Sequence, residues 1–294
     1  MVKIELWNKK TEIEFFTQAK DFATPGQLFY KTPAGKYYAY WPKGYKEAKT
    51  TLQSRNSLIG NFTEKWSVDL LQQFAKKHNL FAIQSVVCEE IGLTKQSPAD
   101  VAICKTKDVI QKAENIVMLF EVKMSVVWNW ELKKECKLEC LGDFTTHQGN
   151  PGMLRSDSML KAIGKSINIR VSGFSSAKIP IIVLGNTPVT KSYHGKVDHL
   201  RKSGIIQGFW SVNPKPREVE TLKRTGFDGF IRMDNYEELL KYLEALFKED
   251  REFFSGMRTK KQLGQIIEIS NKEDTFEKKA EKFLKLIRTE KNGS

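Results

Sequence analysis

Three charged residues in the middle of the chain have the types and the spacing of a site that cleaves phosphodiester bonds. Asp100 lies in the apolar run ADVAIC, residues 99–104, and Glu121 and Lys123 lie in the longer apolar run LFEVKMSVV, residues 119–127. Because side chains alternate between the two faces of a strand, Glu121 and Lys123 point to the same side. If the two strands are neighbours, an aspartate, a glutamate and a lysine meet at one edge of a sheet.

Phosphodiester hydrolysis needs such a trio for a definite reason. Mg²⁺ keeps several of its waters and is usually held by one or two carboxylates, so Asp100 and Glu121 would hold the metal, with the Val122 carbonyl as a further ligand. Lys123 would position the attacking water or lower its pKa. The metal would stabilise the charge that develops as the bond breaks. The alternative is that Glu121 and Lys123 form an exposed ion pair, but two idle charges inside an apolar run are costly to bury.

The elements that must position this trio follow from the apolar spacing along the chain. Apolar side chains that recur every three to four residues predict a helix over residues 61–78, and a second helix begins near Ser156. We expect an α/β fold, in which a central mixed β-sheet is flanked by helices. Short apolar runs predict the strands of this sheet over residues 81–88, 99–104, 115–128 and 179–186.

Aromatic residues on both sides of Pro33-Ala34-Gly35 predict a β-hairpin over residues 27–45. Such rings could stack on DNA bases or pack on the protein core, and core packing is the use that we expect. The aromatic residues concerned are Tyr30, Tyr37, Tyr38 and Trp41.

Pro98, Asp100, Glu121 and Lys123 resemble the signature of the PD-(D/E)XK nuclease superfamily, and in particular of type II restriction endonucleases. In that signature an aspartate that follows a proline opens one core strand, and Glu-x-Lys lies on the next. This chain departs from the pattern because Ala99 separates the proline from the aspartate. The resemblance covers roughly residues 60–190.

The same resemblance extends to the predicted helix before the first strand, where an acidic residue often joins such sites. Glu64 in GNFTEKW resembles this residue, although a glutamate on a helix surface needs no special role. Glu64 is therefore a fourth candidate catalytic residue beside Asp100, Glu121 and Lys123.

The resemblance implies a restriction-endonuclease-like core and a Mg²⁺-dependent enzyme that cuts double-stranded DNA at a specific sequence, leaving 5′-phosphate and 3′-hydroxyl ends. It also implies a homodimer, which most simply cuts both strands of a symmetric site, and a cognate DNA methyltransferase as genetic partner. Two alternatives stay open. One is a structure-specific or repair nuclease of the same superfamily, and the other is a DNA-binding protein that keeps the fold without hydrolysis.

The charge distribution favours a polyanionic partner. The 294 residues carry a net charge of +13, of which residues 1–60 contribute +5, residues 61–150 −1, residues 151–232 +9 and residues 233–294 zero. A basic segment of this kind releases counterions when it binds a duplex, although many such surfaces are merely solvated. The side chains that we expect to contact DNA are Arg155, Lys161, Lys165, Lys191, Lys196, Arg201 and Lys202.

Composition divides the chain into an N-terminal basic and aromatic region (residues 1–60), a nuclease core with the basic DNA-facing segment (61–232) and a helical C-terminal region (233–294). No apolar run approaches the roughly 20 residues that span a bilayer, and the N-terminus is too charged for a secretory signal. Four cysteines without a CxxC pair predict free thiols in a reducing compartment, so we expect a cytoplasmic protein with no disulfide framework.

Overall fold

The computed structural model describes residues 4–46, 51–134, 137–254, 256 and 258–289. The chain divides into two compact units, residues 1–251 and residues 252–294. The first unit contains the predicted trio, and its architecture decides how the candidate site is built.

A six-stranded sheet forms the centre of the first unit, in the order β10-β9-β8-β5-β4-β3. β3, β4 and β5 pair with one another in antiparallel directions, whereas β5, β8, β9 and β10 run parallel. This confirms the mixed central sheet of an α/β fold. The bounds are β3 (Phe81–Val86), β4 (Ala99–Cys104), β5 (Ile116–Lys123), β8 (Ile181–Gly185), β9 (Gly208–Ser211) and β10 (Phe230–Arg232).

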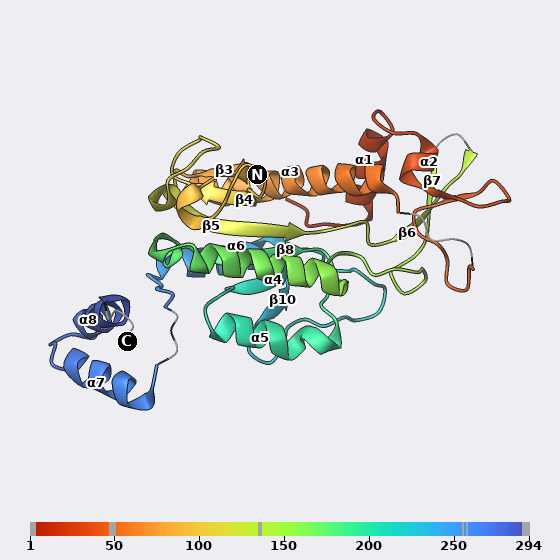
Figure 1. Cartoon of the computed structure of the whole chain (residues 1–294). Helices are drawn as coiled ribbons and strands as arrows, with labels where there is room; N and C mark the ends of the chain where they lie inside the picture. The colour runs from red at the N-terminus through yellow and green to blue at the C-terminus, as the bar shows by residue number, and fades with distance from the viewer. Residues whose placement is uncertain (1–3, 47–50, 135–136, 255, 257, 290–294) are drawn as a thin grey trace. The chain divides into compact units, whose positions relative to one another are not determined.

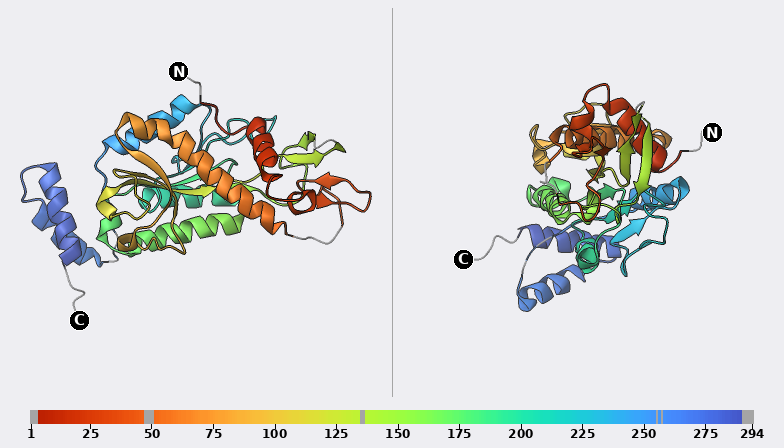
Figure 2. Two further views of the ribbon diagram at one scale, coloured as in Figure 1. Left: turned by 90° about the horizontal axis from the view of Figure 1, so that it is seen from above. Right: turned by 90° about the vertical axis from the view of Figure 1, so that its right-hand side faces the viewer.

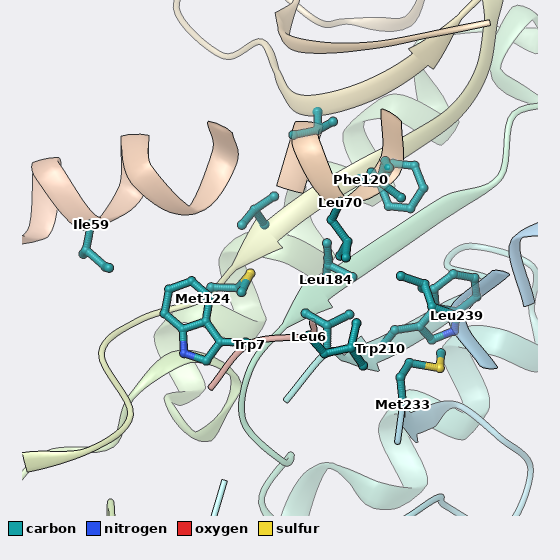
Figure 3. Close-up of a cluster of buried hydrophobic side chains, with 14 of the residues drawn as sticks. Leu6, Trp7, Ile59, Leu70, Phe120, Met124, Leu184, Trp210, Met233 and Leu239 are labelled. Atoms are coloured by element: carbon teal, nitrogen blue, oxygen red, sulfur yellow. The ribbon is translucent and has the colours of Figure 1, made fainter. Parts of the chain in front are cut away.

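Helices cover both faces of this sheet, as Figure 1 shows. The long helix α3 (Gln53–Lys77) and α6 (Tyr236–Lys248) pack on one face, and α4 (Ser156–Val171) and α5 (His194–Lys202) pack on the other. The hydrophobic core on the side of α3 and α6 contains large buried rings such as Trp7, Phe120 and Trp210. Several residues of this core are drawn in Figure 3. Every central strand is therefore buried on both sides, which explains its almost continuous apolar sequence.

Helix α3 begins earlier than its apolar periodicity predicts. The polar stretch before residue 61 shows little amphipathic pattern, yet Arg55 and Ile59 are only 5% exposed. Tertiary burial extends the helix across the compositional boundary at residue 60. Seen from above, α3 runs from the central sheet to a second, smaller sheet (Figure 2).

The small sheet is antiparallel, in the order β1-β2-β6-β7. Its first two strands confirm the predicted hairpin, because Tyr30 pairs with Tyr38 and Lys31 with Tyr37. The bounds of this sheet and of the two helices near it are α1 (Lys9–Ala19), α2 (Pro25–Leu28), β1 (Tyr30–Lys31), β2 (Tyr37–Tyr38), β6 (Asn129–Leu132) and β7 (Leu138–Gly142).

The second unit is built from two helices, α7 (Lys260–Ser270) and α8 (Phe276–Thr289). Within it, the rings of Phe254 and Phe283 meet edge to face, with their centroids 5.5 Å apart. Helix α6, which composition groups with these helices, belongs instead to the first unit, where Leu239 and Leu243 join the core. None of the helices in the described ranges is long and apolar enough to cross a membrane.

Glu12 of α1 is fully buried and satisfied by four N–H groups. Its carboxylate accepts from the indole nitrogens of Trp7 (3.2 Å) and Trp130 (2.7 Å) and from the backbone amides of Val127 (2.5 Å) and Trp128 (3.3 Å). Burial raises the pKa of Glu12 to about 7, against the lowering effect of these hydrogen bonds. The carboxylate ties α1 to the chain that leaves β5 and enters β6.

The pKa of Glu12 predicts a pH dependence of stability. Because the pKa of Glu12 is raised in the folded state, the contribution of this group to the free energy of unfolding is complete below the unfolded-state pKa of 4.5. That contribution is lost as the pH rises through about 7. Glu12→Gln removes this titration. We expect the free energy of unfolding of the wild type, relative to Glu12→Gln, to fall by roughly 2–3 kcal/mol between pH 4.5 and pH 8, measured by urea denaturation. Glu14→Gln, on the exposed face of α1, is the control, and a pH-independent difference for Glu12→Gln would contradict the prediction.

Candidate functional site

The candidate site lies where β4 begins and β5 ends. The two strands are antiparallel, with Val101 opposite Phe120, and the same register places Asp100 opposite Glu121. Val101 and Phe120 point into the core beneath α3. Because side chains alternate, Asp100 and Glu121 point to the face that α4 covers, and Lys123 follows Glu121 on that face.

Helix α4 adds a second lysine, so that four charged side chains form what we call the ion cluster: Asp100, Glu121, Lys123 and Lys165. Lys165 Nζ lies 3.0 Å from Asp100 Oδ1 and 2.6 Å from Glu121 Oε2. Lys123 Nζ lies 3.5 Å from Asp100 Oδ2 and 2.6 Å from Glu121 Oε1. Each carboxylate therefore offers one oxygen to each lysine, and the formal charges cancel.

The ion cluster is largely withdrawn from solvent. Its side chains are between 9% exposed (Glu121) and 18% exposed (Lys123). The backbone amide of Val122 donates to Asp100 Oδ2 at 2.7 Å, which holds the aspartate against β5. At this burial an unmatched charge would be costly, so the four groups depend on one another.

Burial and neighbouring charges shift two of these groups. Burial, followed by the charge of Asp100, raises the pKa of Glu121 against the opposing effect of the two lysines. Burial alone would lower the pKa of Lys165, but the charges of Asp100 and Glu121 outweigh it and raise that pKa. Lys165 is therefore firmly protonated, and Glu121 holds a proton more readily than a free glutamate.

The ion cluster lies at the bottom of a cleft of about 620 Å³. Glu64 of α3 lines the same cleft and accepts a hydrogen bond from Gln84 Nε2 at 2.9 Å. Burial raises the pKa of Glu64, and the charge of Asp100 adds to the effect. Glu64, the third predicted acid, thus shares the cleft with the trio, while its direct partner is the Gln84 side chain of β3. Among the other lining residues are Ser85, Pro98, Lys161 and Gly164.

Backbone strain marks the β3 side of the cleft. Ser85 has a φ of 56°, in the left-handed region that residues other than glycine rarely adopt. The strand ladder pairs Gln84 with Val101 and Val86 with Ala99, so Ser85 lies at the level of Asp100. Strained residues of this kind concentrate at functional sites. Nothing in the sequence around Ser85 predicts its positive φ.

The oxygens predicted to bind Mg²⁺ lie around the ammonium group of Lys123. Lys123 Nζ lies 2.6 Å from Glu121 Oε1, 3.5 Å from Asp100 Oδ2 and 3.1 Å from the Val122 carbonyl oxygen. An all-oxygen set of this kind suits Mg²⁺ once the ammonium moves aside. Within the described ranges, no group of three or more His, Cys, Asp or Glu side chains could hold a metal, so waters and substrate would have to complete the coordination.

The structure places three of the predicted DNA-contacting residues at or near the cleft. Lys161 is exposed and lines it, whereas Lys165 belongs to the ion cluster. Arg155 immediately precedes α4 and forms a two-pronged pair with Asp157, at 3.0 and 2.6 Å. The charge of Arg155 is therefore matched within the protein.

Of the other four predicted DNA-contacting residues, three lie in α5 and Lys191 lies just before it. Helix α5 packs on β9 and β10 at the opposite edge of the sheet from β3. Arg201 donates to the carbonyl oxygen of Asp228 at 2.8 Å, and Lys202 lies 3.0 Å from the ring centroid of Phe227. The sequence groups these residues with Lys161 and Lys165 as DNA contacts only because they lie in the same basic segment of the chain. The order of the strands places them away from the cleft. The remaining two are Lys191, which begins a short turn over Lys191–Tyr193, and Lys196, which lies over the Tyr193 ring.

The sequence interpretation missed the contact of Lys165 with both acids. A signal was present, since the buried stripe of α4 contains Ala162 and Ser166, and Lys161 and Lys165 each precede a member of that stripe by one residue. Side chains at the border of a buried stripe reach the edge of the sheet below rather than open solvent.

Removing Lys165 tests how strongly the four charges depend on one another. We expect Lys165→Met to lower the free energy of unfolding by about 2 kcal/mol at pH 8, because two carboxylates would then share one ammonium. The loss should shrink at pH 5, where the raised pKa of Glu121 lets a proton replace the missing charge. Urea denaturation at both pH values measures it.

Two further variants make this stability prediction specific. Adding Glu121→Gln to Lys165→Met should restore most of the lost stability, because it removes the excess carboxylate. Lys161→Met, one helical turn away and exposed, should change the stability by less than about 0.5 kcal/mol. An equal loss in Lys161→Met and Lys165→Met would show that the ion cluster has no special role in the fold.

Comparison with known proteins adds no relative. No protein-family model, no curated protein and no solved structure matches the chain. The interpretation of the site therefore depends on its own geometry and chemistry.

Proposed function

We propose that this protein is a Mg²⁺-dependent endonuclease that cuts double-stranded DNA, with a restriction-endonuclease-like core. The observation that carries the proposal is the meeting of Asp100, Glu121 and Lys123 with Lys165 in one cleft at the edge of the sheet. Charges from four separate positions of the chain gather there with most of their surface buried. Such an arrangement is costly to maintain without a use.

The chain's own residues divide the work in this proposal. Asp100, Glu121 and the Val122 carbonyl would hold the metal, which when bound activates water and neutralises the phosphate. Lys123 would release these oxygens and turn to the attacking water or the phosphate, because its Nζ now occupies the place among them that the metal would take. Lys165 would act as a positioning residue, because it contacts the other oxygen of each carboxylate and limits its rotation.

The charge of the protein supports a nucleic-acid substrate. The net charge is +13, and Lys161 adds an exposed ammonium group to the wall of the cleft. When a DNA phosphate enters the cleft, the ammonium groups that line it would replace the counterions around that phosphate and release them to the solvent. Cutting at a specific sequence as a homodimer, with 5′-phosphate products and a cognate methyltransferase, remains the form of this activity that the sequence resemblance favours.

One observation favours the second candidate, a DNA-binding protein without hydrolysis. The two acids and two lysines neutralise one another, so the ion cluster is also a self-sufficient structural unit. The two candidates differ in one consequence. A purely structural cluster leaves DNA intact in the presence of Mg²⁺, whereas a catalytic one does not.

Substitutions at the trio test the proposed hydrolysis. We expect Asp100→Ala and Lys123→Ala to lower the rate of phage-DNA cleavage in Mg²⁺ at least about 100-fold, because each removes a group that acts on the metal or the water. DNA retention in Ca²⁺, measured by gel shift, should change by no more than about threefold. The wild type should give discrete fragments from linear phage DNA.

The matched control is Lys105→Ala, an exposed lysine just beyond the opposite end of β4. It should cut DNA at the wild-type rate. Full activity in Lys123→Ala, or intact DNA with the wild type on a panel of phage genomes, would remove the proposal. A preference for branched over linear duplexes would indicate a structure-specific nuclease instead.

A further inference from the structure

A second cavity lies beside the cleft and takes no part in the proposed hydrolysis. Its volume is about 530 Å³, within the usual size range of ligand sites. We call it the aromatic pocket. Rings, amides and hydroxyl groups line it, among them Tyr30, Tyr40, Trp41, Asn56, Ser125 and Asn150.

The rings of the aromatic pocket are stacked on one another. Trp41 lies between Tyr30, at a centroid distance of 5.1 Å, and Tyr45, at 4.6 Å with the planes only 7° apart. Tyr40 stacks on His147 at 3.9 Å and 6°. Trp41 is only 9% exposed, whereas Tyr30 and Tyr40 are partly exposed and line the pocket, so these two are the rings that a flat ligand would contact.

A buried arginine holds these rings in place. Arg55 of α3 is 5% exposed and donates to the carbonyl oxygens of Leu28 and Ala39. Its guanidinium group lies 5.4 Å from the ring centroid of Tyr30 and 5.0 Å from that of Tyr40. Because the arginine is anchored to the backbone, the pocket wall is fixed before any ligand arrives.

Three segments connect the aromatic pocket to the cleft. Helix α4 lines the pocket with Ser156 and the cleft with Lys165, and nine residues of helix span about 14 Å. Ser125 of the pocket follows Lys123 of the ion cluster by two residues, about 7 Å of extended chain.

The loop between residues 148 and 154 forms the third connection. Gly152 has a φ of 53°, and a Cβ there would lie 3.0 Å from the carbonyl oxygen of Lys123. This loop, which carries Asn150 of the pocket, therefore packs directly on the end of β5. The pocket and the cleft are therefore lined by residues of the same segments of the chain.

We propose that the aromatic pocket binds an unstacked nucleobase of the DNA strand whose phosphodiester lies in the cleft. This inference rests on the proposed function and extends it to a substrate contact. The separation of about 7–14 Å corresponds to roughly two to four nucleotides at about 3.4 Å each. A base offers a flat face for the rings and a polar edge for Asn56, Asn150 and Ser125. Stacking on an aromatic side chain stabilises a bound base by about 1–3 kcal/mol.

Two single strands of equal length and charge test the inference, a thymidine 20-mer and an abasic 20-mer, both with Ca²⁺ in place of Mg²⁺. The wild type should bind the thymidine strand at least about 10-fold more tightly, since stacking of about 1.4 kcal/mol gives that factor. Asn56→Trp should fill the pocket from an exposed position of α3 and abolish this preference. Its affinity for the abasic strand should stay unchanged, which also shows that the variant is folded.

Further variants separate stacking from general damage. Tyr30→Leu should lower the preference about 10-fold, and Tyr30→Phe, which keeps the ring, should restore it. Gln73→Trp places the same bulk on an exposed position of α3 about 25 Å from Asn56 and should keep the full preference.

Two results would overturn the proposal that the aromatic pocket binds a base. One is equal wild-type affinity for the two strands, and the other is an unchanged preference of Asn56→Trp for the thymidine strand. Phage-DNA cleavage by the same wild-type preparation judges the nuclease proposal separately. Cleavage without a base preference refutes only the pocket, and a base preference lost in Asn56→Trp without cleavage refutes only the hydrolysis. Failure to bind either strand refutes the pocket, and phage-DNA cleavage then decides the hydrolysis alone.

Discussion

The mutual neutralisation of two buried carboxylates by two ammonium groups is the constraint on which the functional end of the fold depends. Glu121 is 9% exposed, and either acid alone at this depth would favour protonation or unfolding. The cluster holds only if β4, β5 and α4 keep their relative positions, because every member contacts two others. It therefore couples the packing of one helix on the sheet to the geometry of the candidate catalytic groups.

Two buried acids in this protein are stabilised in different ways, and the difference separates scaffold from site. Glu12 is satisfied by indole and backbone N–H groups, which cannot leave, and it ties α1 to the chain that follows β5. Glu121 is satisfied by lysine side chains, which can rotate away when a metal or a phosphate takes their place. Fixed partners suit a structural role, whereas exchangeable partners suit a binding site.

The segment that leaves β5 connects the two halves of the first unit. It carries Lys123 in the ion cluster, Ser125 in the aromatic pocket and Val127, which donates to Glu12, before the chain enters β6 of the small sheet. The hairpin region supplies the rings of the aromatic pocket, and α3, which runs from the central sheet to the small sheet (Figure 2), supplies Arg55.

The sequence by itself determined the mixed α/β class, four of the six central strands and the common face of Glu121 and Lys123, because alternation along a strand is a local property of the backbone. The strands β9 and β10 were not predicted, and Asp100 reaches the other two residues only through the antiparallel pairing of β4 with β5. Only the tertiary structure decided the rest. Lys165 joins these acids, Ser85 adopts a positive φ beside them, and Arg201 and Lys202 lie toward the opposite edge of the sheet. Those outcomes depend on helix packing and strand order, which connect residues far apart in the chain. Of these, only the position of Lys165 beside the buried stripe of α4 left a trace in the periodicity of the sequence.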